Sequence, residues 1–269
     1  MSVAVTLLGT GGSAGLPQIG GADGRGDWGI CDPDETRNRR TRASIVIHAP
    51  EGRILVDTAP ELRLQLTDAG IGRIDALIFT HPHADHIAGF DEIRILNRII
   101  DRPMPTYADR RTWDELRERF TYAFRPWAPP GFYRPVLGEH LIAPGETHRI
   151  AGADIEIIAQ DHGFIPTLGL RVGDFAYCTD VVRFEPEAYE RLRGVRIFVI
   201  DCFTRGRPHP THANLRQVLA WVEELKPART ILTHMGPDMD FRTLEADLPD
   251  GVEPGYDGMQ IEGIADDAG

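Results

Sequence analysis

Short apolar runs, separated by polar and glycine-rich stretches, predict a chain in which strands alternate with helices. The runs are rich in β-branched residues, and each is too short to form a helix of its own. The predicted strands are residues 3–8, 44–48, 53–57, 75–80, 154–160, 168–172, 175–179, 195–200 and 230–233. Such alternation is typical of the α/β fold class.

Apolar residues at helical spacing predict helices between these runs. Asp109 stands where an N-cap is expected, and Gly70 where a helix is expected to end. Thr211 is the N-cap candidate of a helix that reaches Leu225, which places His212 at its first helical position. The predicted helices are residues 60–70, 89–100, 109–120, 212–225 and 241–248, followed by an acidic, glycine-rich tail.

One domain spanning residues 1–269 is predicted, because no linker and no internal repeat divides the chain. Both strand-rich halves carry candidate site residues, which indicates two sheets that face one another with helices outside. Residues 121–136 interrupt the pattern, since four prolines stand there among aromatic residues. Proline excludes regular structure, so we expect an irregular insertion at this point.

The composition limits the classes of binding partner and the cellular compartment that we expect. A net charge of −12, from 41 acidic and 29 basic residues, repels nucleic acid and anionic membranes. No apolar run approaches the ~18 residues that a membrane-spanning helix needs. The N-terminal stretch lacks the basic start of a signal peptide, and the scattered Cys31, Cys178 and Cys202 form no disulfide framework. We therefore expect a cytoplasmic protein with reduced thiols.

Residues 81–86, His-Pro-His-Ala-Asp-His, hold the densest group of metal-binding side chains in the sequence. They lie between the predicted strand at 75–80 and the helix that starts at Gly89, where α/β proteins place their chemistry. Three imidazoles and one carboxylate converging in a short loop are the usual sign of a transition metal. A solvated loop that merely contains several histidines is the alternative.

Four such groups are too many for one tetrahedral metal with an open position and too few for two metals. Further ligands are therefore expected at later strand ends, where His162, Asp180 and His234 stand. Together the seven residues predict a site for two divalent cations with a carboxylate between them. Two cations ~3.5–4 Å apart can hold a hydroxide as nucleophile and clamp the oxygens of a phosphoryl or acyl group.

Two other polar or glycine-rich stretches leave alternatives open. Residues 9–15 match a loose dinucleotide-binding pattern, but no helix follows and no acidic strand end appears about 20 residues later. A glycine loop whose backbone passes close to the site is the preferred interpretation. The arginine-rich part of the long loop at 20–42 either is solvated or attracts an anionic substrate. Its members are Arg37, Arg39, Arg40 and Arg42.

The insertion at 121–136 also has two interpretations. Trp127 and its aromatic neighbours could stack on a flat part of the substrate, with Arg125 facing its charge. Alternatively, the aromatic residues pack against each other or against a second copy of the chain in a homodimer.

The ordered set His81-x-His83-x-Asp85-His86, His162, Asp180 and His234 resembles the metallo-β-lactamase-fold hydrolases in their dinuclear form. This resemblance implies a four-layer αβ/βα sandwich with the site at the edge between two mixed sheets. It implies that His81, His83 and His162 bind one metal and that Asp85, His86 and His234 bind the other. Asp180 would then bridge both, and Asp57 would orient the loop without binding metal.

Further motifs resemble the phosphoribosyl cyclic phosphodiesterase branch, the C–P lyase accessory proteins. They are Gly9-Thr-Gly-Gly-Ser, Asp201-Cys, Thr211-His-Ala-Asn-Leu, Ile231-Leu-Thr-His and Gly255-Tyr-Asp-Gly-Met. The resemblance implies that His212 binds the phosphate and protonates the leaving group. The structural zinc of that branch is not expected, because the N-terminal loop has only Cys31 and position 237 is proline.

The expected function is that of a dinuclear hydrolase using Zn or Mn, with His212 and Asp85 as catalytic residues. The expected substrate is a small anionic phosphate, such as a cyclic phosphate or a nucleotide-like diester. Hydrolysis of a carboxyl ester, lactone or thioester is the alternative, as is a metal-binding sensor without turnover, because one fold serves many chemistries. A tRNA-processing nuclease fits the negative charge poorly.

Overall fold

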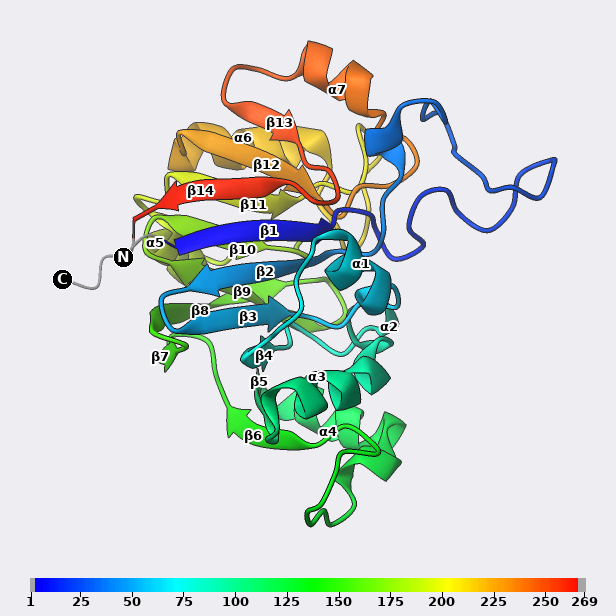
Figure 1. Cartoon of the computed structure of the whole chain (residues 1–269). Coiled ribbons are helices and arrows are strands. Elements are labelled where there is room, and N and C mark those ends of the chain that lie inside the picture. Colours follow the sequence, from blue (N-terminus) through cyan, green and yellow to red (C-terminus); the bar gives the residue numbers. More distant parts are fainter. Residues whose placement is uncertain (1–2, 266–269) are drawn as a thin grey trace.

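Two seven-stranded sheets face one another in the computed structural model, which describes residues 3–265 (Figure 1). The predicted domain of 1–269 therefore extends at both ends beyond the described residues. Within 3–265, no helix is both long enough and apolar enough to cross a bilayer.

The first sheet has the strand order β14-β1-β2-β3-β4-β5-β6. Antiparallel pairing joins β14, β1, β2 and β3, and parallel pairing joins β3 through β6, so the sheet is mixed. Its strands are β1 (Val3–Gly9), β2 (Ser44–Ala49), β3 (Gly52–Val56), β4 (Ala76–Ile78), β5 (Met104–Ala108), β6 (Leu137–Leu141) and β14 (Gln260–Ile264).

The second sheet repeats this plan with the order β13-β12-β11-β10-β9-β8-β7. Here β7 to β10 are antiparallel, and β10 to β13 are parallel. Its strands are β7 (Thr147–Ile150), β8 (Ala153–Asp161), β9 (Pro166–Val172), β10 (Phe175–Cys178), β11 (Ile197–Asp201), β12 (Arg229–Thr233) and β13 (Val252–Pro254).

Helices cover the outer face of each sheet (Figure 1). Those on the first sheet are α1 (Leu62–Asp68), α2 (Ala84–Ile87), α3 (Ile93–Ile100) and α4 (Arg110–Arg119). Those on the second are α5 (Pro186–Leu192), α6 (Leu215–Leu225) and α7 (Phe241–Asp247). Short 3-10 turns occupy Thr36–Asn38, Phe90–Glu92 and Thr121–Phe124.

The strands alternate their side chains between two cores, as the period of a β-strand requires. On β2, Ile45 and Ile47 enter the core between the sheets, whereas Val46 packs against the helices. On β3, Ile54 and Val56 point inward and Leu55 outward. Because both faces are buried, these strands read as continuous apolar runs. The predicted four-layer αβ/βα sandwich is confirmed.

The acidic, glycine-rich segment after residue 248, where no strand is predicted, forms two strands. This segment supplies β13, which pairs with β12, and β14, which pairs with β1. Its inward side chains, Met259, Ile261 and Ile264, belong to the core between the sheets. The strands are short and interrupted by glycine, so the local pattern is weak and pairing with a preformed sheet edge determines them.

The predicted cap of α6 is also wrong. Asn214, not Thr211, is the N-cap: its side chain accepts a hydrogen bond from Gln217 N, and the Gln217 side chain bonds back to Asn214 N. This reciprocal capping box satisfies two backbone donors and outcompetes a threonine three residues earlier. His212 therefore lies in the loop before the helix.

The predicted basic cluster does not form one surface. Arg40 is fully buried and donates to the carbonyl of Met239 at 2.6 Å. Arg37 pairs with Glu35, and Arg42 pairs with Glu61. Arg37 also pairs with Glu245, so three of the four arginines in this cluster attach the loop at 20–42 to the rest of the protein.

Candidate metal centre

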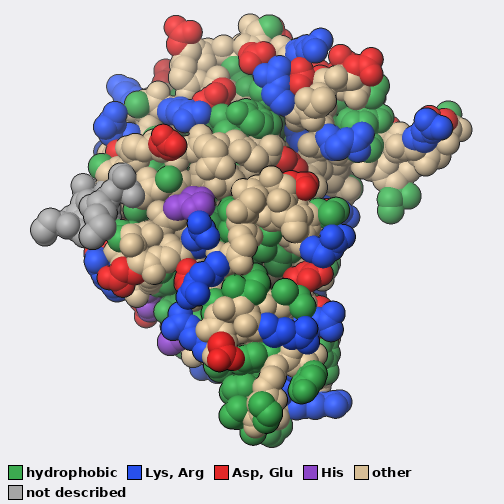
Figure 2. Space-filling view, in the orientation of Figure 1, with side chains coloured by type: hydrophobic (Ala, Val, Ile, Leu, Met, Phe, Trp, Pro, Cys, Tyr) green, Lys and Arg blue, Asp and Glu red, His purple; other side chains and the backbone are tan. Residues whose placement is uncertain are grey.

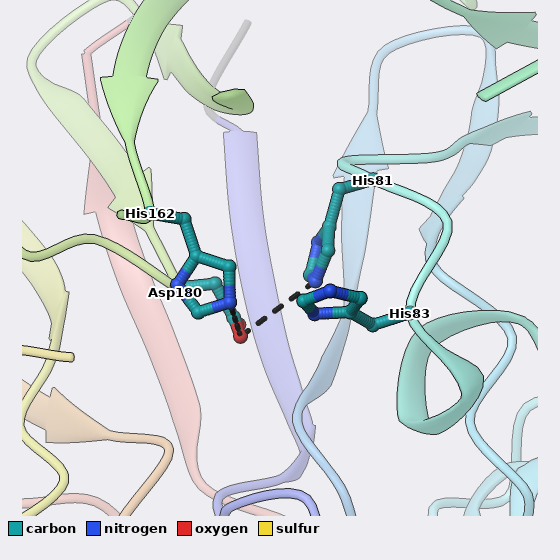
Figure 3. A group of neighbouring side chains, drawn as sticks. All are labelled: His81, His83, His162 and Asp180. Carbon is teal, nitrogen blue, oxygen red and sulfur yellow. Dashed lines mark ion pairs between the residues drawn. The ribbon is translucent and has the colours of Figure 1, made fainter. Parts of the chain in front are cut away.

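Loops at one edge of the sandwich bring the seven predicted ligand side chains together. Donor atoms of His81, His83, His162 and Asp180 lie within 4.8 Å of one another (Figure 3). A second group with the same spacing consists of Asp85, His86, Asp180 and His234. Asp180 belongs to both groups, which places its carboxylate between them.

Strand ends position these side chains. His81 follows β4 after three residues, His162 directly follows β8, and His234 directly follows β12. Asp180 and His234 have φ values of 55° and 54°, in the left-handed region that L-residues rarely occupy. Strained backbone of this kind is a feature of functional sites.

Hydrogen bonds at Nδ1 orient three of the imidazoles. His86 Nδ1 lies 2.8 Å from Asp57 Oδ2, and His81 Nδ1 lies 3.0 Å from Thr80 Oγ1. His162 Nδ1 donates to the carbonyl of Thr211 at 2.7 Å. Because a carbonyl only accepts, Nε2 of His162 carries the lone pair, and it lies 3.6 Å from Asp180 Oδ1.

Unpartnered nitrogens at the centre fit a divalent cation. Among residues 3–265, the buried His81 Nε2 and His86 Nε2 make no aligned hydrogen bond, although His86 Nε2 lies 3.1 Å from Asp180 Oδ2. A buried polar atom left unpaired costs about 1–3 kcal/mol, so a ligand is expected at such a position. Mixed imidazole and carboxylate donors suit Zn and Mn.

The charges of the cluster also favour a bound divalent cation. Burial acts to raise the pKa of Asp180, but the imidazoles of His234 and His86 outweigh it and hold that pKa well below its usual value. Burial lowers the pKa of His81 and of His162, which keeps both imidazoles neutral. Burial also acts to lower the pKa of His234, yet Asp180 and the neighbouring carboxylates raise it to about 9. The carboxylates therefore attract positive charge to this site.

His212 stands beside this cluster without belonging to either group of four. Its ring is buried, and its centroid lies 4.6 Å from those of His162 and His234. Its Nδ1 lies 2.8 Å from Asp201 Oδ2 and 4.0 Å from Asp180 Oδ1. The rival histidine, His209, is less buried, and its ring centroid lies 5.1 Å from that of His212.

Sequence reasoning missed two residues of this neighbourhood. Asp201 appears in the sequence analysis only within the Asp201-Cys motif, which gives it no role, and no local spacing indicates its pairing with His212. Phe203 is half-buried, and its ring centroid lies 5.0 Å from that of His212. A Cβ added at Gly12 would lie 2.7 Å from the Phe203 ring, so the glycine loop approaches the site closely at this position.

The insertion lies apart from the cluster in every described contact. Trp127 stacks on Phe132 with ring centroids 4.9 Å apart, and its indole N–H donates to Gly131 O. Arg125 is exposed, and the loop projects beyond α4 at the foot of the first sheet (Figure 1). Figure 2 shows hydrophobic side chains gathered at this foot. The assignment of Trp127 and Arg125 to substrate binding stays a prediction.

Comparison with known proteins places the chain among hydrolases. The beta-lactamase superfamily domain matches residues 52–235. An octanoyltransferase of Porphyromonas gingivalis is 31% identical over 265 residues, which cover 98% of this chain and 52% of that protein. The chain thus spans about half the length of that relative.

Two solved structures share the architecture. A diphosphatase from the PhnP family superposes with a TM-score of 0.86 at 32% identity, covering 98% of each chain. The Zn-bound PqqB of Methylobacterium extorquens has a TM-score of 0.75 at 17% identity, covering 96% of this chain and 99% of that one. At this lower identity the second likeness concerns the fold alone.

Proposed function

The chain belongs to the β-lactamase superfamily and is a metallo-β-lactamase-fold hydrolase, and from this premise we propose that it is a phosphodiesterase. Its substrate would be a small cyclic phosphate or a nucleotide-like diester. The similar diphosphatase from the PhnP family, at 32% identity over nearly the whole chain, supports a phosphate compound as the substrate class. The net charge of −12 favours a small anion over a polyanion such as RNA.

The proposed cofactors are two divalent cations. His81, His83 and His162 would hold one, Asp85, His86 and His234 the other, and Asp180 would contact both; the two groups are those within 4.8 Å. Zn or Mn bound there would polarise the phosphoryl group and lower the pKa of a water molecule enough for attack on phosphorus. The zinc in the structurally similar PqqB is consistent with this assignment.

The position of His212 is the observation that favours a phosphodiester as the substrate. It is a buried imidazole outside both groups of four, and the contact of its Nδ1 with Asp201 leaves Nε2 free to meet a substrate. A diester expels an alkoxide, which needs a proton, and the aligned imidazole can donate one. In its charged form His212 would also hold a phosphate oxygen, while Asp201 stabilises that charge.

Asp85 is the proposed acceptor of the proton that the attacking water loses. Burial acts to raise the pKa of Asp85, but His86 and His234 outweigh it and keep the carboxyl ionised. Its Oδ2 lies 3.4 Å from His86 Nε2 and 3.5 Å from His234 Nε2. The carboxylate is thereby held at the centre of the second group.

A parallel assay separates the candidate functions. Bis-p-nitrophenyl phosphate, a lactone and a thioester are offered with added Zn or Mn, and we expect metal-dependent hydrolysis of the diester in preference to the others. Faster turnover of the lactone or thioester would contradict the proposal and favour acyl chemistry, the class to which the name octanoyltransferase belongs. Tight metal binding without any turnover would favour a sensor.

A further inference from the structure

We propose that Phe164 forms an aromatic wall of the substrate site and selects diesters that carry a flat or apolar group. This inference rests on the phosphodiesterase activity proposed above, and it names the part of the substrate that the metal cluster does not recognise.

Phe164 lies at the tip of the hairpin that joins β8 to β9, two residues after His162. The tip is tight: Phe164 N donates to His162 O at 3.0 Å, and His162 N donates to Ile165 O at 3.1 Å. Consecutive Cα atoms are about 3.8 Å apart, so the Cα of Phe164 lies within about 7.6 Å of that of His162. The backbone of Phe164 is therefore close to that of a candidate metal ligand.

The other residues of the tip are fixed by contacts. His162 points into the cluster, and Ile165 is buried. Gly163 has a φ of 77°, and a Cβ there would lie 2.6 Å from the carbonyl of Pro210. The tip is thus pressed against the loop that carries His212, and flexing away from the site would break this packing.

Phe164 remains in solvent, with 84% of its surface exposed. An exposed aromatic ring on a packed turn near a polar site is an apolar surface that a ligand can cover. Phe203, half-buried against His212, offers a second ring beside the cluster. The anionic part of a diester would face the metals, and a base or aryl group would lie against Phe164.

Ile99 provides a control. It is an apolar side chain with 45% of its surface exposed, and it lies on α3, outside the cluster and outside the insertion. A general effect of removing an exposed apolar side chain would appear in both variants, whereas a stacking wall affects only one.

The test compares two esters with the same leaving group, thymidine 5′-p-nitrophenyl phosphate and methyl p-nitrophenyl phosphate. Stacking of a base on an aromatic side chain is worth ~1–3 kcal/mol, so Phe164→Ala should lower kcat/KM for the thymidine ester about tenfold, mainly through KM. The methyl ester should change less than twofold, Phe164→Trp should retain the preference, and Ile99→Ala should leave both esters unchanged. The dissociation constant of thymidine 5′-monophosphate, measured by calorimetry, should rise about tenfold in Phe164→Ala.

The outcomes separate the two proposals. If the wild type cleaves both esters but Phe164→Ala affects them equally or not at all, the wall is overturned and the phosphodiesterase stands. If Phe164→Ala changes the oligomeric state and leaves nucleotide binding unaltered, the ring is a subunit contact, and the wall is again overturned. If the wild type cleaves neither ester with added Zn or Mn, the proposed phosphodiesterase function is rejected, and this inference is rejected as well.

Discussion

Asp201 Oδ2 lies 2.8 Å from Nδ1 of His212, and both side chains are buried. The same oxygen accepts a hydrogen bond from Val181 N at 3.0 Å, directly after Asp180. One carboxylate at the end of β11 therefore sets both the orientation of His212 and the turn that presents Asp180. An imidazole held in this way has a defined tautomer, with its free nitrogen directed away from the carboxylate.

The first prediction concerns this pair. His212→Ala should lower kcat by ~10²-fold or more, the scale of a lost general acid, and should leave the metal content unchanged. Asp201→Asn should lower kcat by ~10-fold or more, because the amide does not stabilise the charged imidazole. The double variant should be no slower than His212→Ala, since both changes remove one function. Additive losses in this cycle, or normal turnover of a diester with a poor leaving group in His212→Ala, would reject the pairing.

The second prediction concerns the cations. Protein purified without chelators should contain close to two transition-metal ions per chain, as the two groups of ligands require. His83→Ala and Asp180→Ala should lose metal and activity together, with the larger loss for Asp180, whose carboxylate belongs to both groups. Elemental analysis measures this, and His140→Ala, an exposed histidine outside the cluster, is the control. Wild-type protein that neither carries nor takes up metal would refute the site.

The third prediction concerns Asp57, which is fully buried behind the first ligand loop. Its carboxylate accepts hydrogen bonds from Thr80 N at 2.8 Å and Thr80 Oγ1 at 2.7 Å, and it lies 2.8 Å from His86 Nδ1. Loss of such a partner typically reduces metal affinity 10–100-fold.

Asp57→Asn should therefore release one cation more readily in a competition titration with a chelator. Asp75→Asn, at the opposite end of β4, should bind metal like the wild type. Equal affinities for the two variants would show that Asp57 does not orient His86.

The fourth prediction concerns stability and pH. Asp240 caps α7 and accepts hydrogen bonds from Thr243 N, Asp32 N and Asn38 Nδ2. Burial acts to raise its pKa, but the hydrogen bonds outweigh burial and lower that pKa from 3.8 to about 2. Because the folded-state pKa is lower than the unfolded-state pKa, the ionised carboxylate stabilises the fold fully above about pH 5. This stabilisation is lost as the pH falls from 3.8 to about 2 and below.

Asp240→Asn should lower the free energy of unfolding by about 2 kcal/mol at pH 7, as expected for a shift of this size. The difference from wild type should fall to about half at pH 3, measured by urea denaturation. Asp250→Asn, an exposed acid in the following turn, should show neither effect. A deficit for Asp240→Asn that stays constant between pH 7 and pH 3 would exclude the charge as its cause.

The sequence by itself determined most of the strands and the ligand-bearing loops. A strand that is buried on both faces is an apolar run in the sequence, regardless of which strands it pairs with. Residues 44–48 and 53–57 are examples. The metal-binding pattern of 81–86 is also local, because one short loop carries its side chains. The later candidates, His162, Asp180 and His234, could be named because each follows a strong apolar run directly or nearly so.

Only the tertiary structure decided features that depend on distant partners. Pairing with the existing sheet edges made the final residues into β13 and β14, whereas the Asn214–Gln217 capping box is a local pattern that the sequence already contained. A carbonyl nearly two hundred residues away accounts for the burial of Arg40. The pairing of Asp201 with His212 and the exposure of Phe164 depend on how the loops meet. No local periodicity encodes such contacts, because their free energy comes from burial and hydrogen bonds formed only when the two sheets pack together.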